Sequence, residues 1–249
     1  QFTYDMLDRM TGCCRDKNGN LVLRCTEVQY DANNNVVLFR SGEAVNGNDP
    51  NAVVQFLYDE RGLPFQSVAA PGTGLGATSQ WDYDANGNCR RVNKIDSITI
   101  KQTVYVHDGF DRCISAIDPL GNVATFTYDR NGNLISERCD GELNDSAGNT
   151  GNRRLSETRY EYDGLDRCVR SRYSFFDVFT ELSISDGEST GSSTYAPNGQ
   201  CLFNTDDNGH TTLFSYDTVG RLASVTDSKT NVVSYTYDEC NNVLSVTQT

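Results

Sequence analysis

A tyrosine followed by an aspartate recurs along nearly the whole of this chain of 249 residues. Two variants, His107-Asp108 and Tyr195-Ala196, complete a series of ten units. The repeated tyrosine or histidine occupies Tyr4, Tyr30, Tyr58, Tyr83, His107, Tyr128, Tyr162, Tyr195, Tyr216 and Tyr237. The shortest spacing, 21 residues, occurs three times and indicates the length of the bare unit. A period of this size predicts a small supersecondary unit that buries its apolar face only against its neighbours.

The position four residues after each repeated tyrosine or histidine, called the fourth position below, holds only glycine, asparagine or aspartate. Its residues are Asp8, Asn34, Gly62, Gly87, Asp111, Gly132, Asp166, Gly199, Gly220 and Asn241. These three residue types tolerate a left-handed backbone better than the others do. The aspartate directly after the tyrosine is suited to accept backbone N–H groups inside a turn. Together these features predict a tight hairpin turn with a left-handed residue at the fourth position.

An arginine follows the fourth position wherever that position is aspartate, as in Asp8-Arg9, Asp111-Arg112 and Asp166-Arg167. The pattern predicts an ion pair, either local or across the hairpin. An exposed pair of this kind contributes only about 0–1 kcal/mol to stability.

A second turn lies between successive Tyr-Asp pairs, as in Asp206-Asp207-Asn208-Gly209-His210. Short runs rich in β-branched and aromatic residues separate the turns, and in Val232–Tyr237 the side chains of Tyr235 and Tyr237 share one face at the strand period of two. Each unit therefore reads as strand, turn, strand, turn. The fold class predicted is all-β, with about twenty short strands in one antiparallel sheet that curves or spirals into a shell or solenoid-like array.

The array is predicted to extend over residues 1–249 as a single series of about ten units. Because Gln1 and Thr249 both fall inside units, we expect the sequence to be a window of a longer array. The longer spacings carry insertions rich in Gly, Ser, Asn and Pro, which predict loops. These insertions are Ser41–Pro50, Ala70–Ser79, Asp140–Asn152 and Ser183–Ser193. Ser41–Pro50 and Asp140–Asn152 are the segments where a partner site is expected first.

The Tyr-Asp-x-x-Gly core, as in Tyr83–Gly87 and Tyr128–Gly132, the second Asp-x-x-Gly-Asn turn and the 21-residue spacing resemble the RHS/YD-repeat family. This family includes bacterial Rhs proteins, shell components of toxin complexes, wall-associated proteins and teneurin-like proteins. The resemblance extends from Tyr4 to Val246. It implies a long β-sheet that spirals into a hollow shell, with the repeated tyrosines helping to pack successive strands. In toxin members the shell encloses a C-terminal toxic polypeptide.

One segment, Asp118-Pro119-Leu120-Gly121, is similar to the Asp-Pro-x-Gly elements of the autoproteolytic region that ends the array in toxin-type members. Here it occupies the slot of an ordinary second turn, in line with Asp206-Asp207-Asn208-Gly209. Asp-Pro is a common turn opener. The sequence therefore predicts a turn and not a cleavage site.

Nothing in the sequence predicts catalysis, a metal or a cofactor. The formal net charge of −13 disfavours nucleic acid as a partner, and no apolar run is long enough to span a membrane. Most aspartates sit in the repeating turns, which indicates an architectural role. The two histidines, His107 and His210, are each expected to be substituted scaffold residues. The Asp-x-Asn-Gly-Asn turns are too short to supply the six to eight oxygens of a calcium site.

The nine cysteines divide into two groups. Cys89, Cys113, Cys168 and Cys201 all lie six residues after a repeated tyrosine or histidine, where other units have an apolar residue. They are predicted to act as small apolar side chains with free thiols. The remaining five are less regular, and disulfides among them stay open if the protein is extracellular. These five are Cys13, Cys14, Cys25, Cys139 and Cys240.

The function predicted is a non-catalytic structural segment of a large secreted or cell-surface RHS/YD-repeat protein. The sheet would form part of a shell that encloses a cargo such as a toxin domain. The alternative is an extracellular filament or adhesion module, because exposed sheet edges can pair from chain to chain. The expected partners are neighbouring repeats of the same longer chain, an enclosed polypeptide or a second copy of the chain.

Overall fold

The computed structural model describes residues 2–17, 20–72, 76–96, 98–143 and 151–249, and gives only the backbone for the strand residues between 14 and 25. The described chain is all-β, with twenty strands and one short helix, α1 (Gly42–Val45). It divides into two compact units, Gln1–Gly121 and Asn122–Thr249. The prediction of an all-β chain with about twenty antiparallel strands is confirmed.

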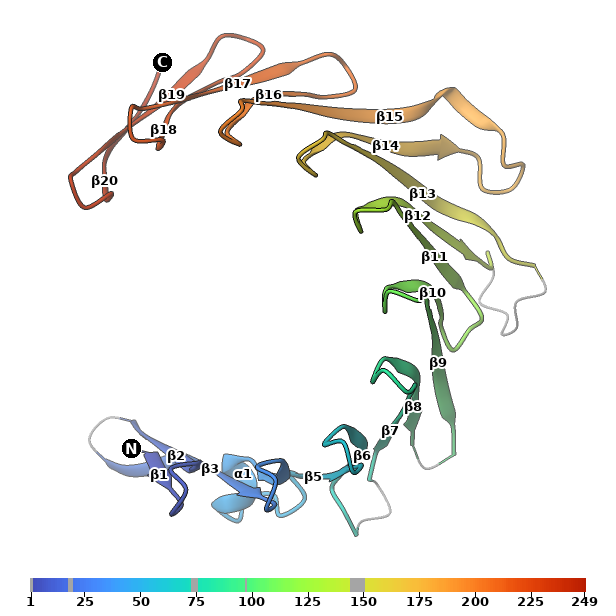
Figure 1. Ribbon diagram of the computed structural model, residues 1–249. Helices are drawn as coiled ribbons and strands as arrows, with labels where there is room; N and C mark the ends of the chain where they lie inside the picture. Colours follow the sequence, from blue (N-terminus) through green and yellow to red (C-terminus); the bar gives the residue numbers. More distant parts are fainter. Residues whose placement is uncertain (1, 18–19, 73–75, 97, 144–150) are drawn as a thin grey trace. The chain divides into compact units, whose positions relative to one another are not determined.

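The first unit contains ten strands, each antiparallel to the next one in the chain (Figure 1). Their bounds are β1 (Phe2–Tyr4), β2 (Met10–Lys17), β3 (Asn20–Tyr30), β4 (Val36–Arg40), β5 (Val53–Tyr58), β6 (Pro64–Ala69), β7 (Thr78–Tyr83), β8 (Cys89–Ile95), β9 (Ile100–His107) and β10 (Cys113–Ile117). Because neighbouring strands alternate in direction, all the Tyr-Asp turns of this unit lie at the same end of its strands. We call this row of turns the Tyr-Asp edge of the sheet.

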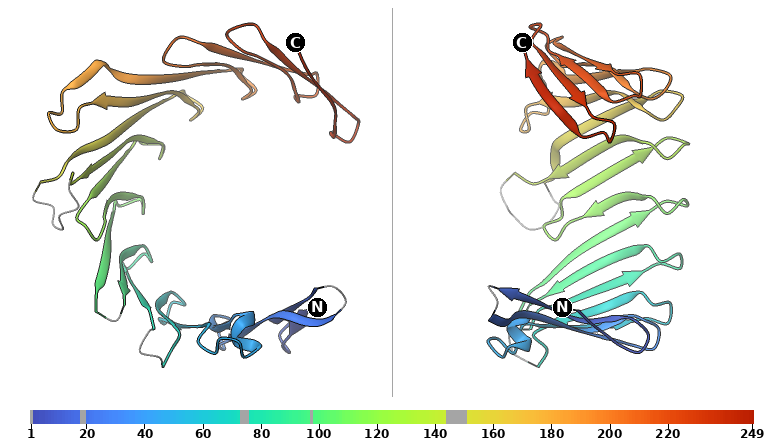
Figure 2. Two further views of the ribbon diagram at one scale, coloured as in Figure 1. Left: turned by 180° about the vertical axis from the view of Figure 1, so that it is seen from behind. Right: turned by 90° about the vertical axis from the view of Figure 1, so that its left-hand side faces the viewer.

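The second unit repeats this plan with ten further strands, again paired antiparallel in chain order (Figure 2). Their bounds are β11 (Val123–Tyr128), β12 (Leu134–Gly141), β13 (Arg153–Tyr162), β14 (Cys168–Phe176), β15 (Ser183–Tyr195), β16 (Cys201–Thr205), β17 (Thr211–Tyr216), β18 (Leu222–Thr226), β19 (Val232–Tyr237) and β20 (Val243–Gln248).

Every Tyr-Asp hairpin contains a β-bulge directly after its turn. In the β11–β12 hairpin, Tyr128 is opposite Leu134 and Thr127 is opposite Ser136, so that one residue of β12 is extra. The same register shift recurs in the other nine hairpins. A bulge increases the local twist of a strand pair. The repeat therefore fixes strand register and twist as well as turn type.

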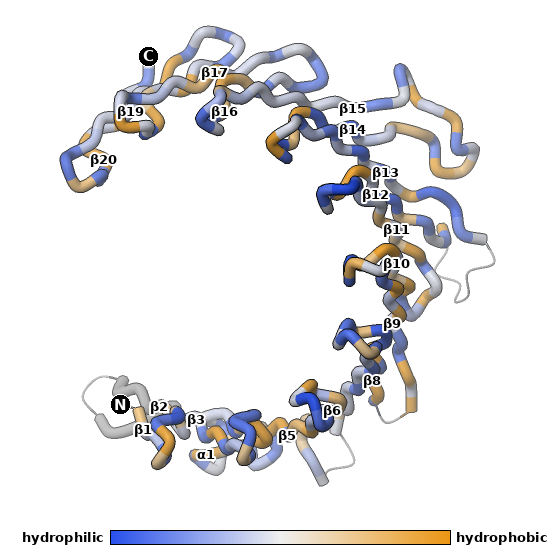
Figure 3. Tube along the Cα trace, in the orientation of Figure 1, coloured by the Kyte–Doolittle hydropathy of each residue, from blue (hydrophilic) through white to orange (hydrophobic). Residues whose placement is uncertain are grey.

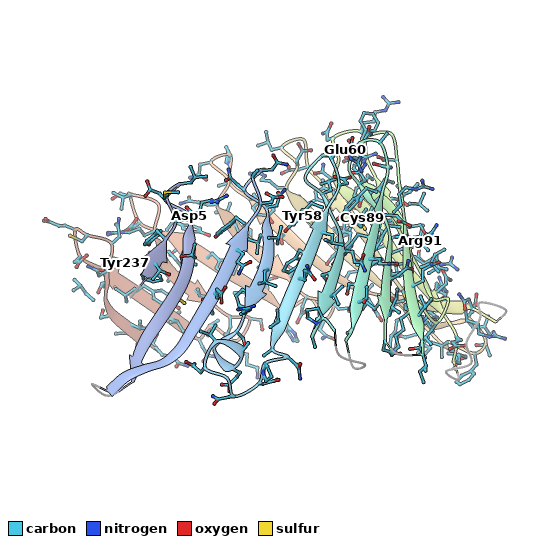
Figure 4. The ribbon with its side chains drawn as sticks, turned by 90° about the horizontal axis from the view of Figure 1, so that it is seen from below. Asp5, Tyr58, Glu60, Cys89, Arg91 and Tyr237 are labelled. Carbon is cyan, nitrogen blue, oxygen red and sulfur yellow. The ribbon has the colours of Figure 1, made fainter. Side chains whose placement is uncertain are left out.

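The sheet of each unit is a single layer with little fully buried surface. Among the described residues, Val28 is the one apolar side chain that is buried, at 8% exposure. Hydrophilic and hydrophobic residues are interspersed along the strands (Figure 3). In the first unit, the side chains of Tyr58 on β5 and of Cys89 and Arg91 on β8 project from the sheet (Figure 4). Contacts between adjacent hairpins therefore stabilise the array more than a central core does.

The insertions depart in part from the predicted loops. Ser183–Ser193 was wrongly predicted to be a loop, because it belongs to β15. Ser and Thr side chains can line a strand when a neighbouring ladder is available, and β15 pairs with β14 from Glu188 to Ser192. Its irregular part is confined to the positive φ angles of Ser185 and Gly187. Likewise Thr78 and Ser79 belong to β7, Asp140 and Gly141 to β12, and Ser41–Pro50 contains α1; residues 73–75 and 144–150 lie outside the described residues.

Candidate functional site

The Tyr-Asp turns form one repeated structure along the edge of each sheet. In the turn after Tyr128, the N–H of Asp129 donates to the carbonyl of Asn133 at 2.9 Å, and the N–H of Gly132 donates back to Asp129 at 3.3 Å. Asp129 Oδ1 accepts the N–H groups of Asn131 and Asn133 at 2.9 and 2.8 Å. The aspartate therefore satisfies donors that the turn would otherwise leave unpaired.

The turn after Tyr195 keeps this backbone without the aspartate. The N–H of Ala196 donates to Gln200 at 2.8 Å, and the N–H of Gly199 donates to Ala196 at 3.0 Å. Asn198 Oδ1 accepts the N–H of Gln200 at 3.2 Å and so replaces part of the missing carboxylate. The backbone geometry is thus a stronger constraint than the identity of the residue after the tyrosine.

All ten fourth-position residues have positive φ angles. The five residues that are Asp or Asn have φ between 58° and 68°, and the five glycines have φ between 80° and 95°. The first group is Asp8, Asn34, Asp111, Asp166 and Asn241, and the second is Gly62, Gly87, Gly132, Gly199 and Gly220. A left-handed backbone explains the restriction to three residue types, since other side chains meet steric strain there.

Hydrogen bonds hold the turn aspartates in their charged form. The side chain of Arg167 lowers the pKa of Asp163, and the amide of Asn242 lowers that of Asp238. The Asn35 amide has the same effect on the pKa of Asp31. A hydrogen bond to the ionised form favours it over the neutral form. These carboxylates therefore act as fixed acceptors and are unsuited to carry protons near neutral pH.

The repeated tyrosines link each unit to the one before it. In seven described units, the hydroxyl donates to the carbonyl of the residue six positions after the preceding repeated tyrosine, which we call the sixth position, at 2.8 to 3.1 Å. The pairs are Tyr30–Met10, Tyr58–Val36, Tyr83–Pro64, Tyr162–Leu134, Tyr195–Cys168, Tyr216–Cys201 and Tyr237–Leu222. Burial raises the pKa of Tyr58, Tyr83 and Tyr162. These hydroxyls remain donors well above neutral pH.

An arginine five residues after the tyrosine, at the fifth position, links its turn to the next one. Arg167 Nε donates to Asp163 Oδ2 at 2.7 Å, and its Nη1 donates to the carbonyl of Ala196 at 2.7 Å. Its guanidinium also lies over the Tyr195 ring, 4.9 Å from the centroid. Arg9 and Arg221 make the same contacts with the turns after Tyr30 and Tyr237.

The ion pair of these arginines is therefore formed with the aspartate after the tyrosine in the same turn. Arg9 and Arg167 pair with Asp5 and Asp163, and not with the fourth-position Asp8 and Asp166. The local ion pair expected from the sequence is present, and its partner is the aspartate four residues earlier.

An asparagine at the fifth position makes a related bridge. Asn133 Nδ2 donates to Asp129 Oδ2 of its own turn at 3.0 Å and to Asp166 Oδ1 of the next turn at 2.7 Å. Asn88 bonds Asp84 and Asp111 in the same way, at 3.1 and 2.6 Å. Consecutive turns are thus connected by side chains as well as by the strands between them.

The family comparison identifies the repeated unit. The RHS Repeat model matches residues 107–141 and 216–249. These two segments are RHS repeats. Each matched segment begins at a repeated tyrosine or histidine, and the same turn geometry recurs in the units outside them.

The repeat array is also similar to larger solved chains. A TcdB2-TccC3-TEV crystal structure matches 99% of this chain at 18% identity with a TM-score of 0.47, and this chain spans 15% of it. The Tc holotoxin pore of Photorhabdus luminescens matches 99% at 14% identity with a TM-score of 0.35, and this chain spans 16% of that chain. A search of curated proteins finds no match.

One RHS repeat lacks the tyrosine hydroxyl because His107 replaces it. His107 Nδ1 is buried and has no hydrogen-bond partner among the described residues. A cavity of about 620 Å³ lies beside it, lined in part by Trp81, Tyr83, Tyr105 and Arg91. The other histidine, His210, is exposed and its Nδ1 lies 3.1 Å from Asp206 Oδ2 in a second turn. The structure therefore places both histidines at substituted scaffold positions.

The described residues contain no group of three or more His, Cys, Asp or Glu side chains that could hold a metal. Within the same residues, no helix is long and apolar enough to cross a membrane. Asp118–Gly121 forms a turn, in which the N–H of Gly121 donates to Asp118 at 3.0 Å. Cys13, Cys89, Cys168, Cys201 and Cys240 are free thiols, and the side chains of Cys14 and Cys25 lie outside the described part.

The sequence did not reveal the side-chain links between turns. The fifth position varies between Arg, Asn, Gln and Leu, so that it shows no fixed residue type. A weaker signal was available, because each Asn or Asp at the fourth position that follows another unit comes after Arg or Asn at the fifth position of that unit. That pairing becomes visible only when adjacent units are compared.

Proposed function

We propose that this chain is a non-catalytic segment of a large secreted or cell-surface RHS-repeat protein, whose sheet forms part of a shell around a cargo polypeptide. The structural role follows from the RHS repeats and from the repeated links between turns. The enclosure of a cargo, secretion and the absence of catalysis are proposals.

The observation that carries the proposal is the single-layer sheet with half-exposed apolar side chains on its strands. In the second unit, Phe203 and Leu213 face each other across adjacent strands and are 39% and 43% exposed. Tyr173 and Phe175 on β14 are 46% and 49% exposed. Apolar surface of this kind is stabilised when another polypeptide covers it. An enclosed, incompletely folded cargo would meet such side chains.

Electron microscopy of the full-length protein that carries this chain tests the proposal. Closed hollow particles are expected, together with a C-terminal polypeptide that resists added protease until the shell is opened. Long filaments without an internal protected polypeptide would support the alternative role as a filament or adhesion module. All six residues of β20 are exposed, which favours this alternative if strands pair between chains.

Location is tested separately by fractionating cells that produce the full-length protein. We expect it in the medium or at the cell surface, accessible to an antibody without permeabilisation. A protein retained entirely inside intact cells would contradict this part of the proposal without affecting the structural role of the repeats.

A further inference from the structure

In seven described pairs of neighbouring units, the fifth position of one unit lies against the fourth position of the next. Arg9 Nη1 donates to Asn34 Oδ1 at 2.9 Å, and Arg221 Nη1 donates to Asn241 Oδ1 at 3.0 Å. Gln200 Nε2 donates to the carbonyl of Gly220 at 3.2 Å. The remaining contacts are Asn88–Asp111, Asn133–Asp166, Asn35–Gly62 and Leu63–Gly87.

The chemistry of the two positions is matched. Wherever these described pairs have an acceptor side chain at the fourth position, the preceding fifth position supplies an N–H donor. Leucine is found only opposite glycine, where Leu63 Cδ1 lies 3.6 Å from the place of a Cβ on Gly87. An aspartate opposite leucine would leave its carboxylate without that donor, which costs stability. Glycine at the fourth position makes no such demand.

We propose that this pair selects which repeat unit can lie beside which. We further propose that the edge formed by β20 receives a Tyr-Asp unit with an aspartate at its fourth position. The proposal goes beyond the function proposed above, because it concerns the matching of repeats and holds whether or not the array encloses a cargo.

The β20 edge has the features that meet a following unit elsewhere in the array. Asn242 is its fifth-position residue, and Asn242 Nδ2 donates to Asp238 Oδ2 at 2.8 Å, as Asn133 Nδ2 does to Asp129. An amide nitrogen carries two hydrogens. In Asn133 the second bond goes to the next unit's Asp166, whereas the described residues give Asn242 no such partner. Val243 occupies the sixth position, whose carbonyl accepts a tyrosine hydroxyl in other units.

Asparagine at the fifth position faces aspartate at Asp111 and Asp166 but glycine at Gly62, and only the aspartates accept its second N–H. The occupant that would satisfy Asn242 is therefore a strand and turn that present a tyrosine, or a histidine in its place, and an aspartate four residues later. The segment from Asp96 to Ile117 has this form, because its Asp111 accepts Asn86 and Asn88 of the preceding turn at 2.8 and 2.6 Å. It follows a unit with asparagine at the fifth position, as the occupant of the β20 edge would.

The matching rule is tested inside the second unit. Asn131 Nδ2 also donates to Asp166 Oδ1, at 2.8 Å, so the donor-free variant combines Asn131→Ala with Asn133→Leu. Combining it with Asp166→Gly rebuilds the Leu63–Gly87 pair at a new place. We expect the donor-free variant to raise the opening equilibrium of the turn amides about tenfold in hydrogen exchange. Adding Asp166→Gly should remove most of that increase.

The matched control is Asp166→Asn, which keeps an acceptor oxygen and a residue suited to positive φ. It should change the opening equilibrium less than about threefold. Strictly additive effects of the donor-free change and Asp166→Gly would overturn the matching rule. The rule would equally be overturned if Asn131 and Asn133 showed coupling of the same size to a glycine at the fourth position, because glycine has no acceptor side chain.

The edge is tested by extending the chain directly after Thr249 with a copy of the segment from Asp96 to Ile117. Thr249 is twelve residues after Tyr237, as Ile95 is after Tyr83, so the copy enters in register. We expect amide exchange in β20 to slow at least tenfold more with the intact copy than with a copy carrying Asp111→Gly. Equal protection by both copies, or protection by neither, would overturn the proposal. Electron microscopy of closed particles would be unaffected by either result.

Discussion

The two rows of connections, one at each end of the strands, differ in how much variation in length and structure they accept. At the Tyr-Asp edge, the turn has the same length, a positive φ at the fourth position and a bulge in all ten hairpins. At the opposite edge, the connections range from the short turn Asp206–His210 to the longer Ser41–Ala52 segment with its helix. Contacts at that edge, such as Arg153 to the carbonyl of Phe179, follow no repeated pattern among the described residues. A turn that must meet a neighbour is constrained, whereas a connection that only closes a loop is not.

Acidification should destabilise the Tyr-Asp edge most widely, because it protonates the aspartate of every turn that carries one. A carboxyl whose pKa is lowered in the folded state stabilises the fold above its unfolded pKa. That contribution is lost as the pH falls below about 4 and through the folded pKa. Asp31, Asp163 and Asp238 all have lowered pKa values. We expect the urea midpoint to fall between pH 5 and pH 3, and a constant midpoint would contradict this prediction.

Gly132→Val should be the largest single change at the Tyr-Asp edge. Gly132 has φ +95° and nothing within 4 Å of an added Cβ, so the cost comes from the backbone and not from a clash. We expect a loss of about 2 kcal/mol in the free energy of unfolding, measured with urea. The control is Gly164→Val in the next turn, where the Cβ also meets open space and φ is not positive. An equal loss in both variants would show that the left-handed backbone is not the cause.

Tyr162→Phe removes one link between units and leaves the ring in place. The hydroxyl donates to the carbonyl of Leu134 at 2.9 Å, so its loss leaves that acceptor unpaired. We expect a loss of about 1 kcal/mol in the free energy of unfolding, with faster amide exchange where β12 meets β13. Tyr160→Phe, on the same strand and outside the hydroxyl pattern, is the control and should have a smaller effect.

The geometry of the Tyr-Asp turns was predictable from the sequence. The side-chain links between neighbouring units were not. The restriction to Gly, Asn and Asp at the fourth position corresponds to positive φ at all ten positions. The tyrosine hydroxyl bonds could not be predicted, because a hydroxyl does not reveal which carbonyl it will reach. Ser183–Ser193 was mistaken for a loop because its composition is that of a turn, whereas its structure is set by pairing with β14. Local residue preference succeeded where the backbone is self-contained and failed where a neighbour decides.

His107→Tyr should repair the one described unit in which the hydroxyl is missing. His107 Nδ1 is buried without a partner among the described residues, and a tyrosine would direct its hydroxyl toward the sixth-position carbonyl of Cys89. We expect a gain of about 0.5–1 kcal/mol in the free energy of unfolding. His107→Phe fills the same space without a hydroxyl and is the control. If both variants gain equally, the filled volume and not the hydrogen bond is responsible.

Replacing Ser41–Ala52 with the sequence of Asp206–His210 tests the permissive edge, and its expected effect is the smallest. The replaced segment lies between β4 and β5 and contains α1, none of whose residues is buried. Loop-closure entropy changes slowly with length, so the shorter connection should compensate for the removal of this exposed helix. We expect the free energy of unfolding to change by less than about 0.5 kcal/mol, with amide exchange at the Tyr-Asp turns unchanged. A loss comparable to that of Gly132→Val would mean that this insertion is a structural part of the repeat, and that the difference between the two edges is smaller than their geometry indicates.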